Sequence, residues 1–260
     1  MEISNFVFAL ALTMLAGLST GVGSALAFFS KQTNTSFLSA ALGFSAGVMI
    51  YVSFVELFPQ ALTLVAESHE HNPELSVVLA FFGGIALISI IDMFIPSAEN
   101  PHEVHLVEEM REVKHLKRTG VLMALAIAIH NFPEGIATFT TAYVNPELAI
   151  PVAFAIAIHN IPEGIAVSIP IYYATRSKKK AFWLSFMSGM AEPVGGLVGF
   201  FILSPFMSSY VLGLVIAAVA GIMVFISVDE LIPAAEKYGK HHYSIYGFVF
   251  GMAVMAISLL

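Results

Sequence analysis

Two copies of one twelve-residue segment carry most of the side chains that could do chemistry. The segment AIAIHNFPEGIA occupies residues 126–137, and AIAIHNIPEGIA occupies residues 155–166, with a single difference between them. In each copy the histidine and the glutamate are four residues apart, so on a helix they share one face. Imidazole nitrogen, carboxylate and amide oxygen together suit divalent transition metals such as Zn²⁺. The repeat therefore predicts a metal site whose candidate ligands are His130, Asn131, Glu134, His159, Asn160 and Glu163.

Four further acidic residues lie within apolar stretches. Glu192 stands in AEPVGG, while Glu56 and Glu230 stand in two copies of SxxELxP, with Asp229 beside Glu230. These stretches contain no Lys or Arg, and a charged group at bilayer depth costs about 3 kcal/mol or more. Metal cations or protons must therefore balance the carboxylates, which disfavours an anionic substrate. We expect Glu192 to join the metal site. Pathway residues and helix-end or gate residues remain equal interpretations of Glu56 and Glu230, and we interpret Asp229 as a residue that lines the pathway or lies at a helix end.

The composition places these residues in a membrane protein. Apolar residues make up 58% of the 260 residues and charged residues only 11%, whereas soluble domains carry about 25% charged residues. The chain has no Cys, which excludes disulfide scaffolds, thiolate metal clusters and cysteine nucleophiles. We expect divalent metal ions and the lipid bilayer as partners, and no nucleic acid.

The apolar residues fall in eight runs of the length that crosses a bilayer as a helix, about 20 residues. We therefore expect an all-α integral membrane protein with a single transmembrane domain over residues 1–260. The predicted helices are 5–29, 37–65, 75–95, 119–143, 147–174, 182–204, 208–234 and 243–260.

The basic residues predict how these helices are oriented. All 11 fall in the loops after the first, third, fifth and seventh helices, and the remaining loops carry only acidic charges. By the positive-inside rule, the basic loops face the cytoplasm and both termini face outside. The first run has no basic residues before it, so we interpret it as a retained span and not a signal peptide. The expected location is the cell (inner) membrane, crossed several times.

The longest of the basic loops, 96–118, mixes acidic and basic residues with three histidines, His102, His105 and His115. We interpret it as a solvated linker. The alternative is a weak metal-sampling role on the cytoplasmic side, together with the nearby His241–His242 pair.

A second repeat indicates the symmetry of the fold. AGVMIYVSFVELFP at 46–59 matches AGIMVFISVDELIP at 220–233, and the two copies lie on helices of opposite predicted direction. The two HNxPEG copies also lie on helices of opposite predicted direction. Antiparallel copies are typical of the inverted repeats of secondary transporters. We therefore predict a 3+2+3 arrangement, in which three helices, a central pair and three inverted helices form the bundle.

With HNFPEGIA, HNIPEGIA and AEPVGG, the chain resembles the ZIP family of metal transporters over essentially its whole length, and most closely a bacterial branch of that family. The resemblance implies uptake of divalent metals into the cytoplasm. Because the ligand types suit borderline metals, we expect Zn²⁺ and Fe²⁺, with Mn²⁺, Co²⁺ and Cd²⁺ as further candidates. It also implies two adjacent metal positions bridged by two glutamates. The first would be formed by His130, Glu134, His159 and Glu163, and the second by Asn131, Glu134, Asn160, Glu163 and Glu192.

The main alternative from another class is an intramembrane metal-dependent hydrolase, which would also place His and Glu around a metal. The chain has no HExxH segment, and its two halves supply equal ligands where a hydrolase needs an open, asymmetric site. We therefore expect a transporter and no enzyme. The driving force and the oligomeric state, including a homodimer, stay open.

Overall fold

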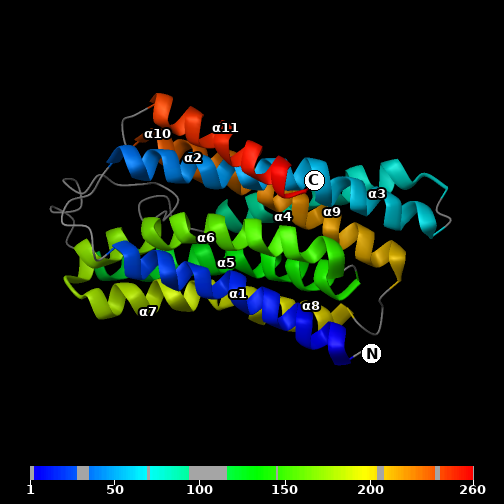
Figure 1. Ribbon diagram of the computed structural model, residues 1–260, viewed down its shortest axis with the longest axis horizontal. Helices are drawn as coiled ribbons and strands as arrows, with labels where there is room; N and C mark the ends of the chain where they lie inside the picture. Colours follow the sequence, from blue (N-terminus) through cyan, green and yellow to red (C-terminus); the bar gives the residue numbers. More distant parts are fainter. Residues whose placement is uncertain are drawn as a thin grey trace.

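The computed structural model describes residues 3–27, 35–68, 71–93, 116–144, 146–203, 208–237 and 241–259. Within these ranges the chain forms eight successive helical rods (Figure 1). In chain order, their elements are α1 (Ile3–Ala27), α2 (Thr35–Val52), η1 (Ser53–Leu57), α3 (Phe58–Glu67), α4 (Pro73–Met93), α5 (Leu116–Val144), α6 (Pro146–Thr175), α7 (Lys178–Gly189), α8 (Ala191–Leu203), α9 (Ser209–Ile226), η5 (Ser227–Leu231), α10 (Ile232–Lys237) and α11 (His241–Ser258).

Five of the described helical segments are long and apolar enough to cross a membrane. They are Ser4–Leu26, Ser39–Glu67, Pro73–Met93, Lys178–Ile202 and Ser209–Glu236. Two of these segments begin with a serine N-cap. Ser177 and Ser208 cap α7 and α9, since each side-chain oxygen accepts a hydrogen bond from the backbone N–H three residues later.

Two rods change from α-helix to π-helix for one turn, which the sequence analysis does not predict. Both turns are formed by the SxxEL segments, as η1 and η5. A proline, Pro59 or Pro233, follows each turn two residues later. A proline cannot donate to the carbonyl four residues before it, and its ring crowds that carbonyl. This crowding favours the wider turn, and π turns occur frequently at functional sites.

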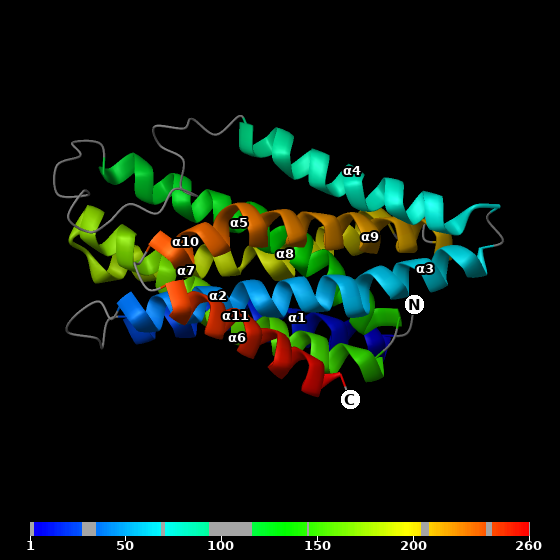
Figure 2. The ribbon, with the colours of Figure 1, turned by 90° about the horizontal axis from the view of Figure 1, so that it is seen from above.

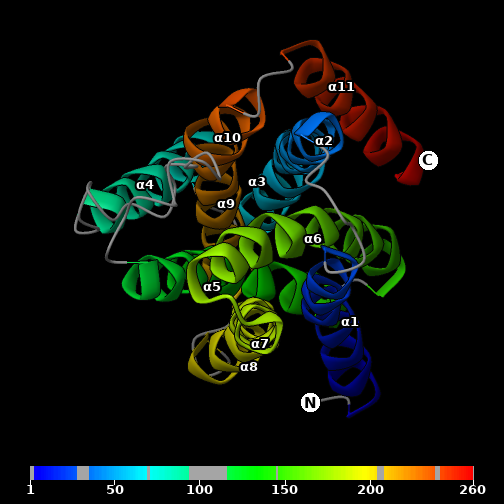
Figure 3. The same cartoon turned by 90° about the vertical axis from the view of Figure 1, so that its left-hand side faces the viewer.

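The rods form two groups, which Figure 3 shows in a view along the bundle. One group contains α1 and α5–α8, and the other contains α2–α4 and α9–α11. Contacts of α2 with α6, and of α5 with α9, join the groups. Figures 1 and 2 show that the C-terminal end of α1 and the N-terminal end of α5 lie at one end of the bundle. The N-terminus of the chain lies toward the other end.

Within each group, the helices pack in matched pairs through glycines. A methyl group on Gly47 of α2 would overlap the carbonyl oxygen of Phe248 of α11. Gly221 of α9, at the same place in the second repeat copy, stands in the same relation to Phe81 of α4. The pair α2–α11 is therefore built like the pair α9–α4. Close backbone approach at glycine is how helices pack where the lipid offers no hydrophobic driving force.

Candidate metal site

His159 of α6 stands between two carboxylates. Its Nε2 lies 3.3 Å from Oε1 of Glu134 on α5 and 3.8 Å from Oε1 of Glu163. The second contact follows from the four-residue spacing along α6, and the first from the packing of α5 against α6. All three residues are buried, with at most 3% of their surface exposed. The structure therefore brings residues from both HNxPEG copies into one buried cluster.

The two asparagines of the motif are oriented by neighbouring helices. Asn131 Nδ2 donates to the carbonyl of Ser188 on α7 at 3.2 Å, and Asn160 Nδ2 donates to the carbonyl of Ala16 on α1 at 3.0 Å. Among the described residues, neither Oδ1 atom has a hydrogen-bond partner, although both side chains are fully buried. An amide whose donors are held and whose acceptor remains available suits a cation.

Glu192, at the start of α8, joins the cluster through Asn160. Asn160 Nδ2 donates to Glu192 Oε2 at 3.0 Å. Glu192 is fully buried, and it lies close enough to Glu134 and Glu163 for their charges to interact. The apolar stretches that contribute these residues hold no Lys or Arg. Three carboxyl groups thus share a buried region to which these stretches contribute no Lys or Arg, an arrangement that attracts cations.

Ser45 of α2 contacts the cluster as well, a contact that no sequence pattern predicts. Its Oγ donates to Oε1 of Glu163 at 3.5 Å. Ser45 immediately precedes one copy of the second repeat, whereas Val219 precedes the other copy. The repeat therefore contains no signal for this hydroxyl, which only the packing of α2 against α6 reveals.

The cluster is not a complete set of metal ligands. The backbone of His130 lies in α5, but its side chain is outside the described part of the structure. Within the part that is described, no three His, Asp or Glu side chains are grouped as a metal would require. The contacts of His159 are pairwise, at hydrogen-bond and ion-pair distances.

Glu56, Asp229 and Glu230 lie on other helices, in the π turns η1 and η5. Asp229 is exposed, and Glu56 and Glu230 are half-buried. Their positions are matched between the two turns, but they belong to the helix group that does not carry the HNxPEG segments. The loop histidines His102, His105 and His115 lie outside the described residues, so the metal-sampling alternative is untested.

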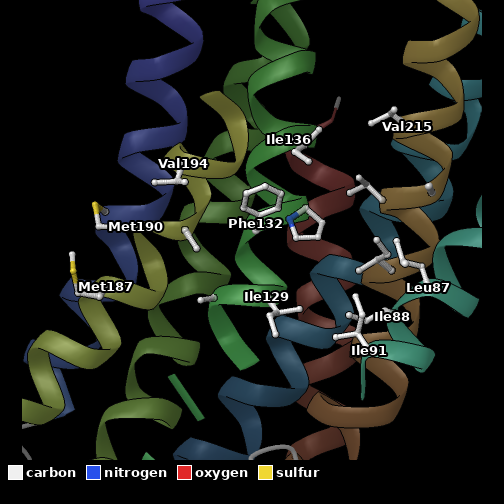
Figure 4. A pocket seen from close by; sticks show the side chains of 16 residues that line it. Leu87, Ile88, Ile91, Ile129, Phe132, Ile136, Met187, Met190, Val194 and Val215 are labelled. Atoms are coloured by element: carbon white, nitrogen blue, oxygen red, sulfur yellow. The ribbon is translucent and has the colours of Figure 1, made fainter. Parts of the chain in front are cut away.

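A large cavity lies beside the cluster but does not share its chemistry. It has a volume of about 720 Å³ and lies between α4 and α9 on one side and α5, α7 and α8 on the other. Figure 4 shows that Ile129, Phe132 and Ile136 of α5 line it, together with Leu87 of α4 and Val215 of α9. These α5 residues lie on a different face from Asn131 and Glu134. The cavity is apolar, and the residues described as lining it include no His, Asp or Glu.

Comparison with known proteins gives the family. The model of a family described as ZIP zinc transporters matches residues 95–259. The chain belongs to the ZIP family. It is 60% identical to zinc transporter ZupT of Streptococcus mutans, over 96% of this chain and 95% of that protein. It is also 54% identical to zinc transporter ZupT of Clostridium perfringens, over 100% and 97% of the two chains.

Membership of the ZIP family confirms several predictions from the sequence. The protein is an all-helical, multi-pass membrane protein. The predicted family resemblance is confirmed, and the bacterial branch to which it pointed is the ZupT type. The family is one of transporters and not of enzymes, so the hydrolase alternative is excluded.

Proposed function

We propose that this protein moves zinc and other divalent transition metals into the cytoplasm. In this proposal, the ions pass through the cluster formed by Glu134, Glu163 and His159. The observation that carries it is the position of the His159 imidazole between two buried carboxylates from antiparallel helices. The zinc transport named for relatives at 54% to 60% identity supports the choice of substrate.

The remaining residues of the motif would complete the ligand set. His130, Asn131, Asn160 and Glu192 join the three cluster residues in a site with two adjacent metal positions, and Glu134 and Glu163 bridge them. The buried, available oxygens of Asn131 and Asn160 support this assignment. Nitrogen and oxygen ligands without thiolate discriminate weakly between Zn²⁺, Fe²⁺, Mn²⁺, Co²⁺ and Cd²⁺. We therefore infer a broad range of substrates.

We further propose a 3+2+3 inverted repeat with both termini outside and the basic loops in the cytoplasm. The matched glycine contacts of α2 with α11 and of α9 with α4 support the symmetry. The exposed lysines Lys178–Lys180 lie next to the short α6–α7 connection, which supports a cytoplasmic position for that end of the bundle.

The direct test is metal flux into sealed vesicles that contain the purified protein. Radioactive zinc should accumulate inside these vesicles and not inside protein-free vesicles of the same lipid. Unlabelled Fe²⁺, Mn²⁺, Co²⁺ and Cd²⁺ should each compete, while Mg²⁺, which prefers an all-oxygen shell with several waters, should not. Zinc that binds to the protein but never enters the lumen would contradict transport.

A further inference from the structure

The glycine contacts of α1 and α8 identify a residue that corresponds to Glu192 in the first half of the chain. A methyl group on Gly135 of α5 would overlap the carbonyl oxygen of Glu192. At the equivalent place in the second HNxPEG copy, Gly164 of α6 would overlap the carbonyl oxygen of Thr20 on α1. Thr20 and Glu192 therefore occupy equivalent backbone positions against the two copies of the motif.

Neighbouring contacts repeat this correspondence. A methyl group on Gly195 would overlap the carbonyl oxygen of Phe132, and one on Gly23 would overlap that of Ile161. Phe132 and Ile161 hold the same place in the two motif copies, and each glycine lies three residues after Glu192 or Thr20. Because the direction of a helical side chain follows from its backbone position, Thr20 points toward the first copy as Glu192 points toward the second.

The surroundings of Thr20 fit this placement. Its side chain is fully buried, and within the described part of the chain its Oγ1 has no hydrogen-bond partner. Oγ1 lies 2.8 Å from the point where a Cβ on Gly189 would stand. The preceding residue, Ser188, accepts the hydrogen bond from Asn131 Nδ2. Thr20 and Asn131 therefore contact adjacent residues at the end of α7, and each has a buried oxygen available as an acceptor.

We propose that Thr20 and Asn131 form a neutral oxygen pair that receives the transported divalent ion on the α5 side of the site. The pair corresponds to the charged pair of Glu192 and Asn160 on the α6 side. In this pair, the Asn131 oxygen is a ligand of the second metal position, and Thr20 Oγ1 accepts a hydrogen bond from water that the ion carries. Thr20 therefore acts as a positioning residue for a partly hydrated ion. The two pairs then occupy equivalent backbone positions, but only the pair on the α6 side contains a carboxylate. This inference rests on the proposed metal transport through the same cluster.

The test is the affinity of the purified full-length protein for Zn²⁺, measured by calorimetry in wild type and Thr20→Val. Valine keeps the shape of threonine and removes the hydroxyl. Because loss of an outer-shell partner weakens metal binding by about 10- to 100-fold, we expect at least a roughly tenfold loss. Thr20→Ser keeps the hydroxyl and should bind within about twofold of wild type.

Thr13→Val is the matched control. Thr13 is a fully buried threonine two turns earlier on α1, and its Oγ1 donates to the carbonyl of Ala9 at 2.8 Å. It should bind Zn²⁺ as wild type does. Equal affinities of Thr20→Val and wild type, or equal losses in Thr20→Val and Thr13→Val, would overturn the inference. If Thr20→Val does not fold, as judged by its melting temperature, Thr20→Ala takes its place with the same expected loss.

A further variant separates this inference from the proposed function. Glu134→Gln should lose far more affinity than Thr20→Val, because it removes a bridging ligand. If Glu134→Gln also binds as wild type does, the metal site itself is wrong. If Glu134→Gln fails to bind while Thr20→Val binds normally, the metal site stands and only the role of Thr20 is wrong.

Discussion

At the scale of single residues, the site combines charge with incomplete hydrogen bonding. Glu134, Glu163 and Glu192 lie in one buried region, and the nearest nitrogen partners described for them are His159 and Asn160. Asn131 and Asn160 donate to the backbones of α7 and α1, and their oxygens have no hydrogen-bond partner among the residues that the structure describes. Buried polar atoms without partners are costly. A divalent cation that passes between them would satisfy both the charges and the oxygens.

The two asparagines should differ in their effect on transport. Among the described residues, Asn160 Nδ2 donates to both the α1 backbone and Glu192, whereas Asn131 Nδ2 donates to the α7 backbone alone. We therefore expect Asn160→Ala to change the Zn²⁺ to Mn²⁺ preference of vesicle flux more than Asn131→Ala does. Both variants should keep measurable zinc flux. Complete loss of flux in both would contradict the assignment of these asparagines to a second, accessory metal position.

Most of these residues could be predicted from the sequence, because the HNxPEG copies repeat polar residue types that apolar bias cannot produce. Ser45 and Thr20 could not. Neither has a similar residue at the equivalent place in the other half of the chain, where Val219 and Glu192 stand. A repeat reveals what its copies share, and contacts made by one copy alone require the packed structure.

At the scale of elements, the bundle depends on helices that approach each other at glycine. Gly84 of α4 contacts the backbone of Ala218 on α9, and Gly251 of α11 has the same relation to Phe44 on α2. Ala218 and Phe44 each lie three residues before the glycines of the second repeat, Gly221 and Gly47. A side chain larger than hydrogen at these crossings would push the helices apart.

Two adjacent glycines of α4 test this dependence. A methyl group on Gly84 would overlap the carbonyl oxygen of Ala218, while one on Gly83 would meet nothing within 4 Å. We expect Gly84→Ala to lower the stability of the purified protein by about 1–3 kcal/mol, the usual cost of overpacking. Gly83→Ala should be neutral or slightly stabilising, since alanine favours helix. Equal melting temperatures for the two variants would contradict the close crossing of α4 and α9.

The sequence predicted eight helices but not their interruptions. The π turns η1 and η5 depend on how the SxxELxP segment accommodates its proline, and a pattern of apolar residues does not contain that information. By contrast, Pro133 and Pro162 lie inside α5 and α6, which continue through them. Proline is therefore preceded by a π turn in two rods and lies within a continuous α-helix in two others, and the residue type alone does not predict which.

At the scale of the whole molecule, the bundle has two distinct ends. The helix ends that flank the basic loops gather at one end of the bundle (Figure 1). The sequence alone predicted this arrangement, because the basic residues lie in alternate loops. The side of the membrane that each end faces remains a prediction of the positive-inside rule.

Single cysteines can test that orientation, because the natural chain has none. His71 lies in the α3–α4 connection and Lys178 at the start of α7, and both side chains are exposed. In intact cells, a membrane-impermeant thiol reagent should label His71→Cys and leave Lys178→Cys unmodified. After permeabilisation, it should label both variants equally. Labelling of Lys178→Cys in intact cells would reverse the orientation.

The central claim is that metal crosses the membrane through the cluster shared by α5 and α6. The most direct measurement is zinc flux into vesicles that contain wild type, Glu134→Gln, Glu163→Gln or Glu236→Gln. Glu236 is an exposed acid near the end of α10 and serves as the control. We predict that flux in Glu134→Gln and Glu163→Gln falls to the level of protein-free vesicles, with normal amounts of folded protein, while Glu236→Gln transports as wild type does. Zinc flux that persists in both cluster variants would contradict the account.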